Sequence, residues 1–260
     1  MPNATDLKKP RSVIITGGTS GLGKALGLAF TKAGDNVFLT YSWGTADENA
    51  LLEEYKQQGL PLPTLVCADT AETESTQELM QLIKTKHEKV DIIINNVSFA
   101  QVVRNADELS RPALHLTLNY SAWPIVDYVQ TAKKIFGQYP KYVIGISSDA
   151  ANVCYPGYAL SGCSKAVLET LIRYLSSFLS SQGTCVNGIR PGFMDTRSSR
   201  ASLGDKLVDK ITASSYPTIP PADVANVAVA LCSGLMDAVN GEIITVDQGA
   251  AHYSFANFIA

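Results

Sequence analysis

The chain has 260 residues and a formal net charge of −3, with 46% hydrophobic and 17% charged residues, which supports one large folded domain and excludes wholesale disorder. No block of basic residues stands out, so nucleic acid is not an expected partner. No apolar run reaches the ~20 residues that a membrane span requires, so no membrane partner is expected either.

Two kinds of segment alternate along nearly the whole chain. Short apolar runs rich in β-branched residues predict buried strands at 12–16, 36–41, 64–68, 90–95, 141–147, 184–190 and 242–246. Amphipathic stretches between them predict helices at about 22–33, 46–58, 73–88, 110–137, 158–181, 197–215 and 221–234. The alternation predicts an α/β fold made of a single doubly wound domain, with a seven-stranded parallel sheet and helices on both faces.

The ends of the chain and its cysteines set the expected domain boundaries and compartment. Residues 1–10 are polar and are expected to form a flexible N-terminal arm, which leaves 11–260 as the folded domain. This start lacks the apolar core of a signal peptide. The five cysteines are dispersed, odd in number and form no C-x-x-C pair, so we expect reduced thiols and a cytoplasmic protein.

The first expected strand runs directly into a glycine-rich turn and then into a helical pattern. The whole segment reads VIITGGTSGLG from residue 13 to residue 23. A strand, a glycine turn and a helix bring backbone N–H groups and the positive end of the helix close to a phosphate. The segment therefore predicts a Rossmann-type site for the pyrophosphate of a dinucleotide, formed by Gly17, Thr19, Ser20, Gly21, Leu22 and Gly23.

The residues at the end of the second expected strand indicate which dinucleotide the protein binds. In a Rossmann-type fold that binds NAD, an acidic residue at this place accepts hydrogen bonds from the adenosine ribose. Here Tyr41 and Ser42 end the strand and no carboxylate occurs before Asp47, so we expect NADP, as NADPH, with NAD as the alternative. Asp69 and Thr70 follow the third strand, where Asp69 either caps the next helix or accepts a hydrogen bond from adenine.

Motifs in the right order along the chain resemble those of the short-chain dehydrogenase/reductase family. The turn at 16–23 is similar to the family's T-G-x3-G-x-G signature, and Asn95 and Asn96 stand where the family reads N-N-A-G. Residues 97–100 (VSFA) depart from that loop and are more similar to the corresponding loop of enoyl reductases. The resemblance implies that Asn95, Asn96 and Val97 lie beside the cofactor.

A second loop late in the chain carries the same resemblance. Residues 190–196 (RPGFMDT) follow the sixth expected strand and resemble the family's P-G-x3-T loop. In the family this loop binds the nicotinamide carboxamide through backbone groups and the threonine. The resemblance therefore implies cofactor contacts from Pro191, Gly192, Phe193 and Thr196.

The expected catalytic helix departs from the commonest pattern of the family. Most members carry Y-x3-K, with a serine thirteen residues before the tyrosine. In this chain Ser161 stands four residues before Lys165, and Ser148 keeps the place of the family serine. The tyrosine is instead Tyr158, seven residues before Lys165, and the spacing Y-x6-K resembles that of the family's enoyl-acyl-carrier-protein reductases.

The longer spacing has a chemical meaning. Carbonyl reduction places hydride on the carbon that bears the oxygen, whereas reduction of a conjugated C=C places hydride on the β-carbon and charge on a more distant oxygen. The resemblance implies that Tyr158 stabilises this enolate and that Lys165 holds the nicotinamide ribose. Ser148 stands where many enoyl reductases have a second aromatic residue, which Tyr155 partly replaces. Asn119 matches the family's helix asparagine that anchors a water beside the lysine.

Together these patterns predict an NAD(P)H-dependent reductase that transfers hydride to the β-carbon of an enoyl thioester or related enone. Two alternatives stay open: a carbonyl or β-keto reductase in which serine or water replaces the tyrosine, and a catalytically weak, cofactor-binding regulatory protein. The expected substrate is a small molecule or an acyl thioester, free or bound to a carrier protein, under a lid at about 197–218. We expect a homotetramer, as in many family members. We expect no metal, because the three histidines share no ligand spacing.

Overall fold

The computed structural model describes residues 9–43 and 47–252. Within these residues the centre of the molecule is a seven-stranded sheet in the order β3-β2-β1-β4-β5-β6-β7. All neighbouring strands are parallel. The strands are β1 (Ser12–Ile15), β2 (Asn36–Tyr41), β3 (Thr64–Cys67), β4 (Ile92–Asn95), β5 (Tyr142–Ile146), β6 (Cys185–Pro191) and β7 (Ile243–Val246). The predicted doubly wound, seven-stranded fold is confirmed.

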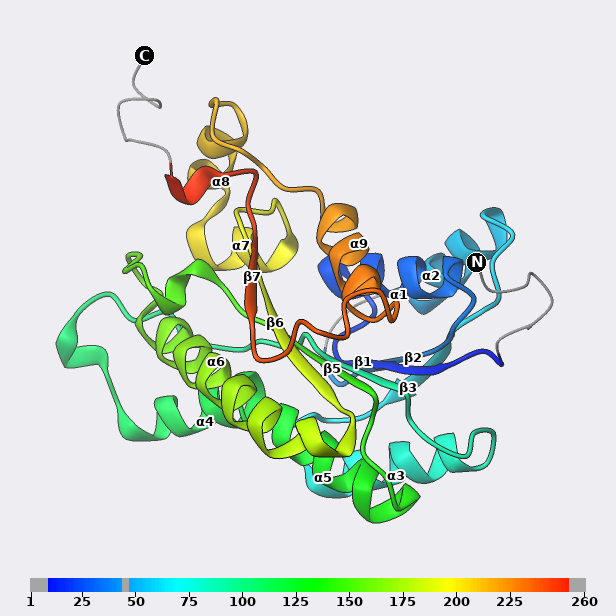
Figure 1. Cartoon of the computed structure of the whole chain (residues 1–260). Helices are drawn as coiled ribbons and strands as arrows, with labels where there is room; N and C mark the ends of the chain where they lie inside the picture. The colour runs from blue at the N-terminus through cyan, green and yellow to red at the C-terminus, as the bar shows by residue number, and fades with distance from the viewer. Residues whose placement is uncertain (1–8, 44–46, 253–260) are drawn as a thin grey trace.

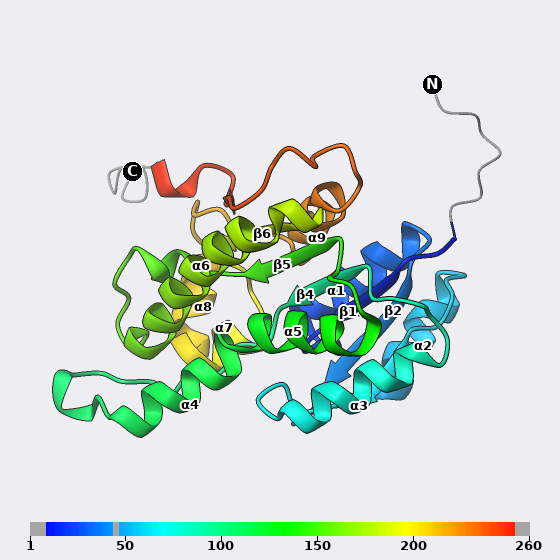
Figure 2. The ribbon, with the colours of Figure 1, turned by 60° about the horizontal axis from the view of Figure 1, so that its bottom comes forward.

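Helices cover both faces of the sheet, as Figures 1 and 2 show. One face carries α1 (Gly21–Lys32), α2 (Glu48–Gln57) and α9 (Pro221–Leu231). The other carries α3 (Thr73–Lys84), α4 (Arg111–Ser121), α5 (Pro124–Phe136) and α6 (Ala159–Leu179). Two short helices, α7 (Arg197–Leu203) and α8 (Asp205–Thr212), lie beyond the carboxyl end of β6 (Figure 1).

Burial of both sheet faces explains why the strands are nearly continuous apolar runs. In β4, Ile92 and Ile94 face the layer of α1 and α9, whereas Ile93 faces the layer of α3, α5 and α6. All three isoleucines are fully buried, which stabilises the fold by roughly 1.5–3 kcal/mol for each side chain. The strand order reverses between β1 and β4, and this reversal opens a crevice for ligands at the carboxyl ends of the strands.

The expected helix at 110–137 is wrong as a single element, because the structure divides it into α4 and α5. Pro124 has no N–H, and the N–H of Trp123 donates to the carbonyl of Leu118, five residues back, at 2.9 Å. The regular hydrogen-bond ladder therefore stops before α5 begins. The expected helix at 197–215 is likewise divided, at Gly204, whose φ of +83° belongs to a region that favours glycine.

Four short 3₁₀ helices complete the described part of the chain: η1 (Ala106–Glu108), η2 (Asp149–Ala151), η3 (Ser180–Gln182) and η4 (Ala250–His252). Of the expected N-terminal arm, residues 1–8 lie outside the described residues. None of the helices in the described part of the chain is both long enough and apolar enough to span a membrane.

Candidate active site

The turn between β1 and α1 has the geometry of a phosphate site. A Cβ on Gly23 would lie 2.0 Å from the carbonyl oxygen of Gly17, so only glycine fits there. Ser20 is the N-cap of α1, but its side chain makes no capping hydrogen bond, and the first turn contains no acidic residue. The N–H groups at the start of α1 are therefore left for an anion. The pyrophosphate of a dinucleotide fits this turn, as the sequence predicts.

Asn96 fastens this turn to the end of β4. Its Nδ2 donates to the carbonyl oxygens of Thr16 at 2.9 Å and Gly17 at 3.2 Å. In return, Thr16 Oγ1 accepts from the N–H groups of Asn96 at 2.9 Å and Val97 at 3.0 Å. These four bonds hold the loop after β4 against the glycine turn, so Asn96 and Val97 lie beside the expected cofactor site.

Two other residues that the sequence assigns to the cofactor have buried side chains. Asn95 is 2% exposed and follows Ile93 by two residues, so it points into the layer of α3, α5 and α6. Thr70 is 5% exposed. Within the described residues, neither the Asn95 amide nor the Thr70 hydroxyl has a hydrogen-bond partner. Both side chains therefore lie in the interior below the crevice, and any contact they make with a cofactor stays a prediction.

Asp69 gathers several groups at the carboxyl ends of β2 and β3. Its Oδ1 accepts from the N–H of Ala71 at 3.0 Å, which caps the turn before α3. Its Oδ2 accepts from Ser42 Oγ at 3.2 Å and from the Tyr120 hydroxyl at 3.1 Å. Burial, and then this carboxylate, raise the pKa of Tyr120 to about 12. Beside Ser42, a hydrogen bond with Glu48 raises the pKa of the Tyr41 hydroxyl.

An aromatic cluster next to Asp69 was only partly predicted from the sequence. Trp43 packs edge-on against Tyr120 with ring centroids 4.8 Å apart, and each of these rings lies 5.8 Å from Phe99. Phe99 stands in the loop that resembles that of enoyl reductases, whereas no sequence motif assigns Trp43 or Tyr120. Trp43 directly follows the end of β2, and its indole remains 62% exposed beside the other two rings.

Lys165 is the buried cation of the site. It lies on α6, is 4% exposed, and donates from Nζ to the carbonyl of Ile146, at the end of β5, at 2.8 Å. Burial lowers its pKa from 10.5 to about 8. An ammonium group has three donors, so two remain for hydroxyl groups of a ligand. This arrangement fits the predicted contact of Lys165 with a ribose.

One helical turn further along α6, a buried ion pair fixes the helix to the sheet. Glu169 is 3% exposed and binds the guanidinium of Arg190 on β6, with an N–O distance of 2.8 Å. Ser147 Oγ, at the end of β5, donates to the same carboxylate at 2.7 Å. Because Glu169 follows Lys165 by four residues, these bonds also fix the face of α6 that presents the lysine.

Tyr158 is held at the start of α6 by the loop that follows β4. It is the N-cap residue, so it stands immediately before the helix rather than within the helix expected from residue 158. The N–H of Val103 donates to the carbonyl of Gly157 at 3.2 Å, and Val103 forms β-bridges with Gly157 and Tyr158. The N–H of Gly162 donates to the Tyr158 carbonyl at 2.7 Å.

The hydroxyl of Tyr158 stays protonated near neutral pH. Burial raises its pKa, the charge of Asp149 raises it further, and a contact with Ser202 of α7 partly opposes both effects. A neutral phenol can donate a hydrogen bond or a proton, which is what stabilisation of an enolate requires. The approach of Ser202 also places α7 over this side of the site.

The hydroxyl of Ser148 forms hydrogen bonds with its neighbours in the loop after β5. Its Oγ accepts from the N–H of Ala150 at 3.2 Å, as the N-cap of η2, and donates to Asp149 Oδ1 at 3.1 Å. A Cβ on Gly162 would lie 2.6 Å from the Ala150 carbonyl, so this glycine lets α6 pack directly on η2. The loop is thereby held against the helix that carries Tyr158 and Lys165.

Asn119 is exposed on α4, a helix that packs beside α6. It lies one turn before the helix is interrupted, where Trp123 bonds to Leu118 and Pro124 cannot donate. Its side chain makes no hydrogen bond with the residues that the structure describes. The role of Asn119 in holding a water beside Lys165 stays a prediction.

The expected nicotinamide loop is fastened to β7 and ends as the cap of α7. The N–H of Gly192 donates to the Val246 carbonyl at 2.9 Å, and Phe193 O accepts from the N–H of Ile219 at 2.7 Å. Thr196 Oγ1 accepts from the N–H of Ser199 at 3.1 Å. Thr196 lies 3.9 Å from the position of a Cβ on Gly21, so this loop reaches the beginning of α1.

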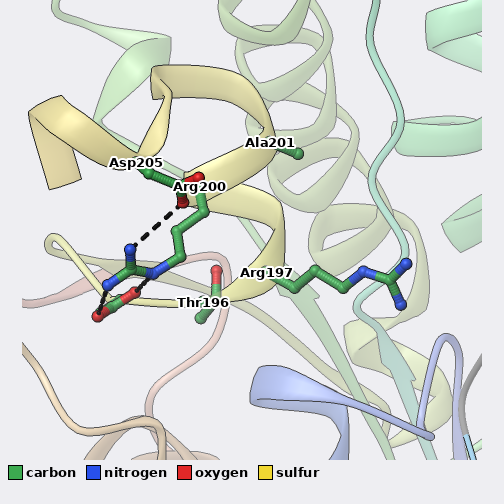
Figure 3. Close-up of a pocket in the computed structure, with 6 residues that line it drawn as sticks. Thr196, Arg197, Arg200, Ala201 and Asp205 are labelled. Carbon is green, nitrogen blue, oxygen red and sulfur yellow. Dashed lines mark hydrogen bonds and ion pairs between the residues drawn. The ribbon is translucent and has the colours of Figure 1, made fainter.

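Figure 3 shows the hollow beside this loop and the charged residues that line it. Arg200 of α7 binds the carboxylate of Asp195 at 2.7 Å and that of Asp205 at 3.3 Å. Arg197, one turn earlier, points away from this group (Figure 3). The bonds of Arg200 join the two short helices of the expected lid. No group of side chains suited to a metal occurs among the described residues.

The family model described as Enoyl-(Acyl carrier protein) reductase matches residues 17–251, which includes the turn, both loops and the expected catalytic helix. The chain belongs to this family of short-chain dehydrogenases/reductases. One relative, the 3-oxoacyl-[acyl-carrier-protein] reductase FabG of Staphylococcus aureus, is 23% identical over 94% of this chain and 99% of its own. The enoyl-[acyl-carrier-protein] reductase [NADH] FabI of Aquifex aeolicus is 23% identical over 94% and 92%. The short-chain dehydrogenase/reductase FrzI of a Cladobotryum species is 26% identical over 91% and 96%.

Solved structures of other proteins have the same fold. An actinorhodin polyketide ketoreductase variant with NADPH superposes with a TM-score of 0.83 at 21% identity, over 94% of this chain and 98% of its own. A short chain dehydrogenase from Burkholderia cenocepacia in complex with NADP gives a TM-score of 0.79 at 22% identity, over 93% and 98%. Likeness at this level of identity establishes the fold of the oxidoreductase.

Proposed function

We propose that this short-chain reductase adds hydride to the β-carbon of an activated C=C, in an enoyl thioester or a related enone. When bound, NADPH supplies the hydride. Tyr158 donates a hydrogen bond to the enolate oxygen that forms, and Lys165 binds the ribose hydroxyls and contributes positive charge. The loop at 191–196 and the glycine turn position the cofactor, and the helices α7 and α8 exclude water above the substrate.

The observation that carries this proposal is the position of Tyr158 at the N-cap of α6, two turns before the buried Lys165. Its neutral hydroxyl faces the side of the site that α7 covers. Ser161 stands at the place of the common family tyrosine, but its hydroxyl makes no hydrogen bond with any described residue and its side chain is shorter by a whole aromatic ring. The proton donor is therefore displaced away from the lysine, as reduction at a β-carbon requires.

The proposal is tested by following NADPH absorbance with a matched set of substrates. The set consists of an enoyl thioester, the β-keto thioester of the same chain length, and a free enone. We expect NADPH oxidation with the enoyl thioester or the enone and little with the β-keto thioester. Turnover of the β-keto thioester alone would establish the opposite assignment.

Carbonyl or β-keto reduction is the second candidate function. It is supported by the similarity to FabG and by Ser148, which keeps the place of the family serine. In this case Ser148, Ser161 or a water takes the part of the missing tyrosine. The third alternative, a regulatory protein of weak activity, is tested by the same assay, because it would bind NADPH without oxidising it with any member of the set.

We expect NADPH to bind at least ~10-fold more tightly than NADH, since one charge-assisted hydrogen bond to the additional phosphate corresponds to about 1.5–3 kcal/mol. The sequence places no acidic residue at the end of β2, where a carboxylate would repel this phosphate, and the similar folds cited above hold NADP or NADPH. Titration of both cofactors by intrinsic fluorescence measures the difference. Equal or tighter binding of NADH would show that Asp69, which reaches Ser42, acts on the ribose instead.

We propose that the enzyme is a homotetramer that pairs through the outer face of α6. This face exposes Tyr174 at 60% and Phe178 at 67%, with their rings in contact at 5.9 Å. Two exposed aromatic side chains on one long helix are typical of a surface that another subunit covers. Sedimentation is expected to give about four times the chain mass of 27.8 kDa, and replacement of both residues with serine should yield smaller species. A 27.8 kDa species alone at micromolar concentration would contradict the assembly.

We further propose that the protein acts in the cytoplasm, on a substrate that is free or bound to a carrier protein. All five cysteines are free, and Cys185 and Cys232 are buried. Burial raises the pKa of both thiols, which keeps them in the unreactive protonated form. Thiols of this kind are compatible with a reducing compartment.

A further inference from the structure

A carboxylate lies beside the expected proton donor. Asp149 is the first residue of η2, and its Oδ2 accepts a hydrogen bond from the Tyr155 hydroxyl at 2.5 Å. The ring of Tyr155 packs edge-on against that of Tyr158, with centroids 6.1 Å apart. One tyrosine therefore connects the Asp149 carboxylate to Tyr158, and the sequence motifs give no role to this acid.

No cation in the described structure neutralises this carboxylate. Its hydrogen-bond donors among the described residues, Ser148 and Tyr155, are neutral hydroxyl groups. Two nearby basic side chains bind other groups: Lys165 donates to the Ile146 carbonyl, and Arg190 is paired with Glu169. A carboxylate offers about four acceptor positions, of which these hydroxyls fill two. Asp149 is half-buried, and within the described residues its carboxylate has no cationic partner and has acceptor positions still open.

This charge opposes the chemistry of the site unless the substrate neutralises it. Stabilisation of an enolate benefits from positive surroundings. Asp149 acts in the reverse direction, since its charge adds to burial in raising the pKa of Tyr158 and of Tyr216. A cationic group of the substrate placed on Asp149 would remove this opposition and would also gain a charge-assisted hydrogen bond.

We propose that Asp149 binds a protonated amine of the substrate, so that the enzyme reduces activated alkenes that carry a basic nitrogen. The alkene part of this statement rests on the proposed function, whereas binding of an ammonium group at Asp149 does not. The ammonium group donates to the positions that Ser148 and Tyr155 leave open on the carboxylate.

The test compares two enones of nearly the same shape, one neutral and one cationic. Acetylcyclohexene is the neutral probe, and N-methyl-acetyltetrahydropyridine, in which a protonated tertiary amine replaces a ring carbon, is the cationic probe. Binding is measured calorimetrically on the complex with oxidised NADP, where no reduction can follow. Affinity is thereby obtained independently of turnover.

We expect the cationic probe to bind ~10- to 100-fold more tightly than the neutral one, the range expected for a charge-assisted hydrogen bond. Asp149→Asn should abolish this preference and leave affinity for the neutral probe nearly unchanged. Tyr155→Phe keeps the charge of Asp149 and should retain the preference. Glu78→Gln removes an exposed carboxylate on α3 and serves as the matched control. Unchanged NADP binding verifies that each variant is folded.

Equal affinity of the wild type for the two probes would overturn the inference. An equal loss of affinity for both probes in Asp149→Asn would also overturn it. A loss of the preference in Tyr155→Phe as large as in Asp149→Asn would overturn it too, because it would show that Asp149 merely positions Tyr155. The proposed function fails separately. If neither probe nor any enoyl thioester oxidises NADPH while the Asp149-dependent preference persists, the ammonium site stands and alkene reduction does not.

Discussion

Replacing Lys165 with methionine is expected to remove nearly all turnover and, at the same time, to stabilise the folded protein. The ammonium group is 4% exposed, and its pKa of about 8 lies well below the 10.5 of a solvated lysine. Such a shift corresponds to about 3 kcal/mol of unfavourable burial, because one pKa unit is about 1.4 kcal/mol. Methionine is close to lysine in size and carries no charge to desolvate.

The stability difference depends on pH in a defined direction. Below about pH 8 lysine is charged in both the folded and the unfolded chain, and the burial cost is present in full. Between about 8 and 10.5 the folded protein has already lost the proton that the unfolded chain still holds, so wild-type stability rises toward that of the variant. Loss of the Ile146 hydrogen bond offsets part of the gain. We therefore expect Lys165→Met to be more stable by about 1–2 kcal/mol at neutral pH.

Thermal unfolding of both proteins across this pH range measures the effect. Turnover should fall by ~10²- to 10⁴-fold, the scale of a lost electrostatic or acid–base group, and NADPH affinity should also weaken. Wild-type turnover should itself decline as pH rises through about 8, as the ammonium group loses its proton. Lys86→Met, which removes an exposed lysine, is the control and should change neither property. A Lys165→Met protein that is less stable at neutral pH, or one that retains turnover, would contradict this account.

Much of the scaffold could be predicted because its causes are local in the sequence. Runs such as Ile92–Ile94 are buried on both faces of a parallel sheet, so they need no alternation. The glycine turn could be predicted too, because Gly23 occupies a position where any Cβ would collide with the backbone. The division of the expected helix at 110–137 could also be predicted, because Pro124 has no N–H and cannot donate the hydrogen bond that an unbroken helix needs.

The parts of the site that could not be predicted depend on contacts between distant segments. Asn95 and Asn96 are adjacent, but only the second reaches the glycine turn, because successive side chains of a strand point to opposite faces. Trp43, just after β2, meets Tyr120 on α4, which lies far away in the sequence. The proposed role of Asp149 depends on two contacts that the sequence does not reveal. Asp149 binds the Tyr155 hydroxyl, and the ring of Tyr155 packs on that of Tyr158.

Tyr158→Phe is expected to lower turnover by ~10- to 1,000-fold while leaving NADPH affinity nearly unchanged. The substitution removes only the hydroxyl, and this loss of turnover is the size expected for removal of one general acid or one oxyanion donor. The ring stays in place, because Tyr155 packs on it and Val103 and Gly162 bond to its backbone. Fluorescence titration gives the cofactor affinity, and NADPH oxidation with the best enone or enoyl thioester gives kcat and KM. The loss should therefore appear in kcat rather than in cofactor binding.

The matched control for Tyr158 is Ser161→Ala, one turn along α6 toward Lys165. The Ser161 hydroxyl has no hydrogen bond within the described structure, so its removal should change turnover of an alkene by less than ~3-fold, below about 0.7 kcal/mol. A carbonyl reductase that used this serine as its proton donor would be affected in the opposite way. Full activity of Tyr158→Phe together with an inactive Ser161→Ala would therefore reverse the assignment, because the proton donor would then stand beside Lys165, where hydride attacks a carbonyl carbon.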